Sequence, residues 1–200
     1  MVQSNHQITQ SPNHQIRMRV IAGSLKGRRL KPPTWEGLRP TSDKLRETLF
    51  NILAPRMAGA RVLDGYAGTG AVGIEARSRG AEAVTFVERD RRAQSLIAEN
   101  VAHCGIENGY AIIRASVGRA LADLRTAGAL FDIVLLDPPY EEPIDDVLAV
   151  LADVLAPAGI AVVEHARRRP TPPRAGRLVQ SREVISGDSA LTFYALAYDI

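Results

Sequence analysis

From residue 61 onward, short apolar runs alternate along the chain with segments of helical periodicity. These runs are rich in Val, Ile, Leu and Phe and have the length of buried strands. They lie at residues 61–64, 83–88, 110–113, 131–136 and 159–164, and helical patterns cover 71–79, 91–103, 117–124 and 143–155. Two further runs, at 178–185 and 190–198, predict a closing pair of strands. Strands that alternate with helices predict an α/β fold, with a mostly parallel sheet covered on both faces.

The chain has 200 residues, enough for one such domain with a small appendage. Residues 1–16 are polar, repeat the pattern Asn-His-Gln-Ile and lack apolar periodicity, so we expect a disordered tail. Met18 opens the first structured segment and is a candidate for the native start. Residues 17–58 predict a β-hairpin, with arms at 18–21 and 28–31, and a lead-in helix that Pro55 closes.

Basic residues are concentrated upstream of the predicted sheet. Residues 17–46 contain nine basic and two acidic side chains, which leaves +7 there although the whole chain carries only +3. A basic arm on a mildly acidic body indicates a polyanion as partner. The side chains expected to contact it are Arg19, Lys26, Arg28, Arg29, Lys31 and Arg39. An ordinary solvated basic surface is the alternative interpretation.

Composition excludes several classes of protein. The single cysteine, Cys104, rules out an internal disulfide and a thiol metal cluster. His103 and His165 have no partners at metal-ligand spacing, so we expect no metal. No apolar run approaches the roughly 18 residues that a membrane span needs, and the N-terminus lacks a signal-peptide pattern. We therefore expect a cytoplasmic protein without membrane contact, and a monomer.

The sequence Asp137-Pro138-Pro139-Tyr140 directly follows the apolar run at 131–136. The prolines end that strand, so the four residues lie at the carboxyl edge of the sheet, where open parallel sheets bind ligands. The Asp137 carboxylate and the Pro138 carbonyl are two acceptors, and Tyr140 adds a flat stacking face. This set suits an exocyclic amine on a planar ring. The alternative is an ordinary Pro-Pro turn with a surface tyrosine.

A glycine-rich loop joins the first of the alternating strands to its helix, and residues 68–73 satisfy the pattern G-x-G-x-x-G. Asp64 at the mouth of the loop would repel a pyrophosphate. It suits the ammonium group of S-adenosyl-L-methionine (AdoMet), whose carboxylate can use the N–H groups of the loop. Glu88, at the end of the next strand, is placed to accept hydrogen bonds from the ribose hydroxyls of the cofactor. This role fits NAD as well as AdoMet. Asp64 as a helix-capping carboxylate is the alternative.

Together these motifs resemble the class I AdoMet-dependent amino-methyltransferases. The upstream segment makes the resemblance closer, through Arg19-Val-Ile-Ala-Gly, Lys26-Gly-Arg-Arg-Leu, Leu38-Arg-Pro-Thr-Ser-Asp and Arg46-Glu-Thr-Leu-Phe-Asn. These resemble the RsmD-type bacterial 16S rRNA guanine-N2 methyltransferases, over roughly residues 17–198. The resemblance implies a Rossmann-like sheet of seven strands with the last antiparallel, formed by a methyltransferase domain at 59–200, and an RNA-contacting hairpin before it.

The resemblance also implies a function and a set of site residues. The function is methylation of N2 of a guanine, of the guanine-966 type, in the 16S rRNA of the small ribosomal subunit, with AdoMet as cofactor. The implied catalytic residues are Asp137, Pro138, Pro139 and Tyr140. The implied cofactor residues are Asp64, Tyr66, Ala67, Gly68, Thr69, Gly70, Glu88 and Ser116. Tyr66 departs from the more usual Phe, and Ser116 from the commoner Asp or Asn.

Three other functions remain open on these residues. An amino-methyltransferase acting on DNA adenine or on a protein glutamine would share Asp137-Pro138-Pro139-Tyr140. An NAD-dependent oxidoreductase would share the glycine pattern but would leave Asp64 unexplained. A non-catalytic RNA-binding protein would use the fold as a scaffold.

Overall fold

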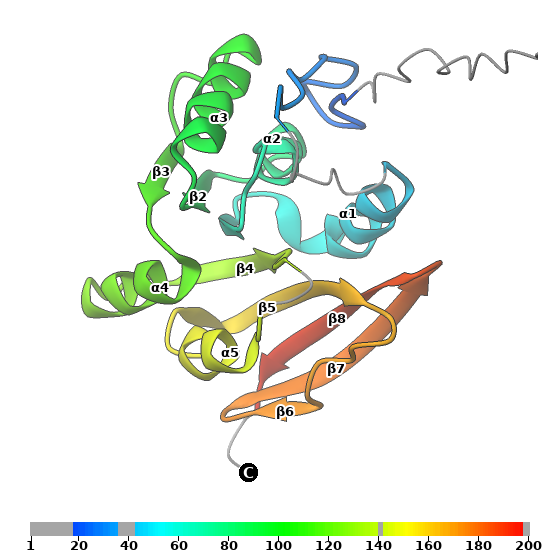
Figure 1. Ribbon diagram of the computed structural model, residues 1–200, viewed down its shortest axis with the longest axis vertical. Coiled ribbons are helices and arrows are strands. Elements are labelled where there is room, and N and C mark those ends of the chain that lie inside the picture. Colours follow the sequence, from blue (N-terminus) through cyan, green and yellow to red (C-terminus); the bar gives the residue numbers. More distant parts are fainter. Residues whose placement is uncertain (1–17, 36–42, 140–141, 198–200) are drawn as a thin grey trace, which may run out of the picture.

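An eight-stranded sheet in the order β3-β2-β1-β4-β5-β8-β7-β6 forms the centre of the computed structural model, which describes residues 18–35, 43–139 and 142–197 (Figure 1). The strands are β1 (Arg61–Gly65), β2 (Ala83–Glu88), β3 (Tyr110–Arg114), β4 (Phe131–Leu136), β5 (Leu155–Ala166), β6 (Arg174–Ala175), β7 (Leu178–Ser186) and β8 (Ser189–Leu196). The helices are α1 (Asp43–Met57), α2 (Ala71–Ser78), α3 (Arg91–His103), α4 (Val117–Thr126) and α5 (Asp145–Leu151).

The predicted α/β class is confirmed. Strands β1 to β5 are parallel, and β8 runs antiparallel between β5 and β7, as expected for the last strand. The two-residue strand β6 is an addition to the seven expected strands. Strand β5 also begins earlier and α5 ends earlier than predicted, because Leu155 already pairs with Phe131 of β4. Pro55 does not close α1, which continues to Met57.

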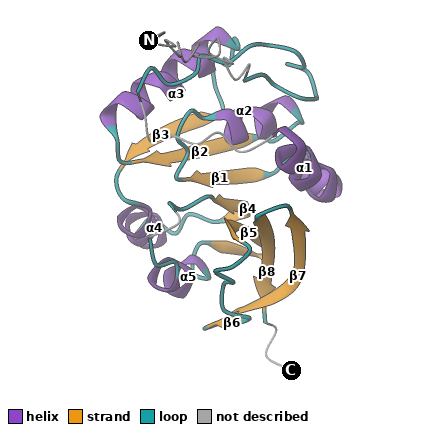
Figure 2. Cartoon of the chain, turned by 45° about the vertical axis from the view of Figure 1, so that its right-hand side comes forward, coloured by secondary structure: helices purple, strands orange, loops and turns teal. Residues whose placement is uncertain are grey.

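The sheet separates two hydrophobic layers, and helices lie on both of its faces (Figure 2). Helices α1, α2 and α3 pack on one face, and α4 and α5 pack on the other. Neighbouring residues of β1 show the alternation, since Val62 belongs to the first layer and Leu63 to the second. With both faces covered, ligand access is left to the edge where the strands end.

The predicted hairpin forms, but only as a single antiparallel bridge between Arg19 and Arg29. Backbone bonds of 2.9 Å from Val20 to Arg28 and from Leu30 to Met18 flank that bridge. Met18, Val20 and Leu30 of the hairpin are buried, whereas its basic side chains are exposed. A Cβ atom at Gly23 would collide with the backbone oxygen of Ser78, so the turn sits directly on α2.

Two features are absent from the part of the chain that the structure describes. None of the helices formed by residues 18–35, 43–139 and 142–197 is long and apolar enough to cross a membrane. Within the same ranges, no three His, Cys, Asp or Glu side chains are grouped so that they could hold a metal ion.

Candidate active site

A cavity of about 850 Å³ opens where the central strands end. It is lined by most of the residues predicted from the sequence, namely Asp64, Tyr66, Ala67, Gly68, Thr69, Glu88, Ser116, Asp137, Pro138 and Pro139. Gly70 is not in the lining; it precedes α2 and has a left-handed backbone with φ of 78°. Tyr140 and Arg39 lie outside the described residues. The sheet thus brings together two motifs that are more than 60 residues apart in sequence.

Asp64 lies at the end of β1 with only 4% of its surface exposed. One of its carboxylate oxygens accepts a 2.8 Å hydrogen bond from the backbone N–H of Gly73, in the first turns of α2. Burial raises the pKa of Asp64 to about 7. The hydrogen bond from Gly73 lowers this pKa, and the negative charges of Asp137 and Glu88 raise it. Asp64 therefore holds the helix and also presents a strongly perturbed carboxyl group to the cavity.

Glu88, at the end of β2, fixes the shape of the glycine loop. One oxygen of its carboxylate accepts from the Gly68 N–H at 3.0 Å, and the other accepts from the Asp90 N–H at 2.8 Å. Each carboxylate oxygen keeps a second lone pair, so these bonds do not exhaust its acceptor capacity.

Gly73 lets α2 approach β2, because a Cβ there would collide with the Phe86 ring.

Asp137, Pro138 and Pro139 form the opposite wall, directly after β4. Their position follows from the register, in which Leu136 pairs with Gly65 of β1 on one side and Val163 of β5 on the other. The carboxyl group of Asp137 is close enough to Asp64 for its charge to raise the pKa of that residue.

Glu142 ties the segment after β4 to the glycine loop. The Tyr66 hydroxyl donates to Glu142 Oε1 at 2.9 Å, and Arg89 Nη1 lies 3.6 Å from Glu142 Oε2. Tyr66 has a left-handed backbone with φ of 61°, which is uncommon for a residue other than glycine. Burial, and next the bond to Glu142, raise the pKa of Tyr66.

Several lining residues were not predicted. Trp35 and Arg92 form one wall, with the Arg92 guanidinium 5.0 Å from the Trp35 ring centroid. Leu45, Arg46, Glu142 and Glu164 also line the cavity. Glu164 could have been predicted from the sequence, because like Glu88 it is a carboxylate at the end of a predicted strand. The others reach the cavity through contacts that sequence periodicity does not encode.

Comparison with known proteins identifies the family. The family model described as Conserved hypothetical protein 95 matches residues 18–195. The chain belongs to this family. The chain is 35% identical over 188 residues to the protein of Escherichia coli (strain K12) named Ribosomal RNA small subunit methyltransferase D, which covers 92% of this chain and 93% of that protein. The resemblance to RsmD-type enzymes is thus confirmed.

Solved structures agree with this assignment to the Conserved hypothetical protein 95 family. Escherichia coli yhhF matches with a TM-score of 0.80 and 33% identity, over 92% of this chain and 99% of that chain. A more distant structure, SMU.776 complexed with SAH, has a TM-score of 0.66 at 15% identity, over 80% of this chain and 52% of that chain. At that identity the likeness shows the fold alone.

Proposed function

We propose that this protein is an AdoMet-dependent methyltransferase that modifies N2 of a guanine in the 16S rRNA of the small ribosomal subunit. The observation that carries the proposal is the single cavity shared by Asp64 of the glycine loop and by Asp137 and Pro138 after β4. The first motif suits the cofactor and the second suits an exocyclic amine. The name of the Escherichia coli relative supports rRNA as the substrate.

The charge of the cavity supports AdoMet over a dinucleotide. Asp64, Glu88 and Asp137 place three carboxyl groups in its walls, and the charges of Glu88 and Asp137 both raise the pKa of Asp64. A ligand with sulfonium and ammonium groups would relieve this repulsion, whereas a pyrophosphate would increase it. The loop N–H groups would hold the carboxylate of the cofactor, and the remaining lone pairs of Glu88 would hold its ribose. AdoMet would supply an electrophilic methyl group.

Asp137 and Pro138 would make the guanine amine nucleophilic. Its two N–H groups would donate to the Asp137 carboxylate and the Pro138 carbonyl, turning the nitrogen lone pair out of conjugation and toward the methyl carbon. As the N–C bond forms and the S–C bond breaks, Asp137 would accept the proton that N2 loses. Stacking of Tyr140 on the base, worth about 1–3 kcal/mol, stays a prediction from the sequence.

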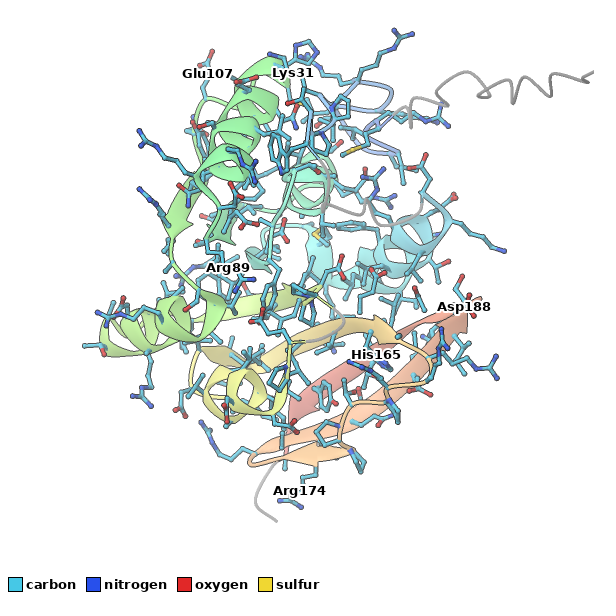
Figure 3. The ribbon with its side chains drawn as sticks, in the orientation of Figure 1. Lys31, Arg89, Glu107, His165, Arg174 and Asp188 are labelled. Atoms are coloured by element: carbon cyan, nitrogen blue, oxygen red, sulfur yellow. The ribbon has the colours of Figure 1, made fainter. Side chains whose placement is uncertain are left out.

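The hairpin would provide the RNA contacts. Its exposed basic side chains lie on one small ribbon, at Arg19, Lys26, Arg28, Arg29 and Lys31. Lys31 anchors the end of that ribbon to α3, because its backbone N–H donates to Asn100 Oδ1 at 2.7 Å (Figure 3). A rigidly mounted basic ribbon suits phosphate contacts, which set the register of the RNA without reading its sequence.

The test is transfer of a labelled methyl group from AdoMet. The substrates are small ribosomal subunits that lack the modification, naked 16S rRNA, and duplex DNA. Label at guanine N2 after digestion of ribosomal RNA is the expected result. Label on DNA would assign the amine chemistry to a different substrate, and no transfer to any nucleic acid would refute the proposal.

A further inference from the structure

Glu164 lies beside Asp137 at the edge of the sheet. The last paired residues of β4 and β5 are Leu136 and Val163, and the next residues along the two strands are Asp137 and Glu164. Adjacent strands are about 4.8 Å apart, and residues at the same register face the same side. Both residues line the large cavity. The fold therefore places Glu164 next to Asp137, the proposed acceptor of the guanine amine.

Glu164 also lies between two hollows. A smaller one of about 260 Å³ shares Pro138, Pro139, Glu142 and Glu164 with the large cavity. Pro143, Ile144, Val163, Ala166 and Pro170 give it apolar surface, and His165, Arg169 and Thr171 add polar side chains. A hollow with apolar surface, a few polar groups and carboxylates at its border suits a planar base whose polar edge faces the carboxylates.

We propose that Glu164 selects guanine by accepting its N1–H while Asp137 and Pro138 hold the N2 amine. This inference rests on the proposed function and names the group that reads the base. In guanine, N1–H and the N2 amine are adjacent donors, so they match two adjacent carboxylates. Adenine has an acceptor at N1, and its lone pair would face the negative charge of Glu164. Rejection by unpaired buried polar groups is the strongest form of discrimination that a pocket can achieve.

The backbone of Glu164 is well placed to hold this contact rigidly. Glu164 pairs with Leu191 of β8 inside the sheet. The next residue, His165, is buried, and its Nε2 lies 2.8 Å from Thr192 Oγ1, which further joins β5 to β8 (Figure 3). A specificity residue on a paired strand is more precisely positioned than one on a loop.

Glu142 borders both hollows but has a different role. Its Oε1 accepts from the Tyr66 hydroxyl at 2.9 Å, and its Oε2 lies 3.6 Å from Arg89, so it braces the glycine loop. Glu142 is therefore unsuitable as a control, and Glu107→Gln is used instead, because it makes the same chemical change at an exposed carboxylate outside both hollows.

The experiment compares guanine with 2-aminopurine at the methylated position, in 16S rRNA joined from fragments and assembled into subunits. 2-Aminopurine keeps the N2 amine but has an acceptor at N1. The unaltered protein is expected to prefer guanine by about 100-fold or more in kcat/KM. In Glu164→Gln the amide can both accept and donate, so the preference should fall at least tenfold. Glu107→Gln should keep it. AdoMet affinity and melting temperature, measured alongside, establish that each variant is folded.

The outcomes separate this inference from the proposed function. Equal rates on the two bases with the unaltered protein would refute the role of Glu164 without any variant. A preference that survives in Glu164→Gln, or that falls equally in Glu107→Gln, would also refute it and leave the proposed function standing. No methyl transfer to guanine by the unaltered protein would refute both.

Discussion

The carboxylate of Glu75 in α2 accepts a 2.7 Å hydrogen bond from the backbone N–H of Ile21, 54 residues earlier in the chain. Its other oxygen accepts from the Ala22 N–H at 2.9 Å and from Arg79 Nε at 2.7 Å. Glu75 is completely buried. Because α2 follows the glycine loop directly, Glu75, together with Ser78 of the same helix, fixes the basic hairpin relative to the cofactor side of the cavity.

Replacing Glu75 with alanine should destabilise the protein by about 3–5 kcal/mol, because it leaves two backbone donors and Arg79 without their buried acceptor. Denaturant unfolding measures the change. The control is Glu99→Ala, which removes an exposed ion pair with Lys31 and should cost less than about 1 kcal/mol. Similar losses in the two variants would mean that the Glu75 contacts do not hold the hairpin.

Replacing Asp137 with alanine should lower the rate of methyl transfer by roughly 10²–10⁴ while AdoMet affinity stays within a few-fold. The carboxylate accepts an amine N–H and then the released proton, and neither task concerns cofactor binding. Single-turnover transfer and calorimetry measure the two quantities. Asp123→Ala removes an exposed carboxylate paired with Arg119 and serves as the control. Normal turnover in Asp137→Ala would exclude this residue from the mechanism.

Reversing the charges of Lys26 and Arg29 should weaken RNA binding and make it less dependent on salt. For every phosphate that the variant no longer neutralises, the slope of log affinity against log salt should become shallower by about 0.7–0.9. Arg28 is left in place because its Nη1 donates to the His103 carbonyl at 3.3 Å. The matched control reverses Arg119 and Arg125 of α4, which are paired with Asp123 and Asp153. An unchanged slope in the hairpin variant would place the RNA path elsewhere.

The candidate site was largely predictable because its residues lie where strands end. Asp64 and Glu88 end the first two of the alternating apolar runs and Asp137 follows the fourth, and parallel strands bring their carboxyl ends to one edge whatever the sequence separation. The glycine loop was predictable for a similar reason, since it joins a strand to a helix. These features depend on local pattern together with one rule of topology.

The contacts between distant segments were not predictable. Glu75 is a polar residue in a short helix, and only the docked hairpin explains why it is buried. The bond between Tyr66 and Glu142 likewise joins residues 76 positions apart. Neither contact leaves a periodic signal, because each depends on how one finished element packs against another. The hairpin was expected from its two arms at 18–21 and 28–31, but its packing against α2 was not.

Asp64 should make both stability and cofactor binding depend on pH. Burial raises its pKa from 3.8 to about 7, so between these values the folded protein keeps a proton that the unfolded chain has released. The free energy of unfolding should therefore fall as pH rises through this window and level off above it. Asp64→Asn cannot ionise, and its unfolding profile should lack this slope.

A bound ammonium group beside Asp64 would favour the ionised carboxylate and lower its pKa. AdoMet affinity should then rise as pH increases from about 6 to about 7, where the ammonium of AdoMet is still protonated, and binding near pH 6.5 should release a proton, since the free carboxyl group titrates at about 7. Calorimetry in buffers of different ionisation enthalpy measures that proton directly. Asp64→Asn should bind AdoMet more weakly, with no proton released and no change in affinity across the same range. A proton released by the Asn variant as well would show that another group titrates, and would remove Asp64 as the partner of the ammonium.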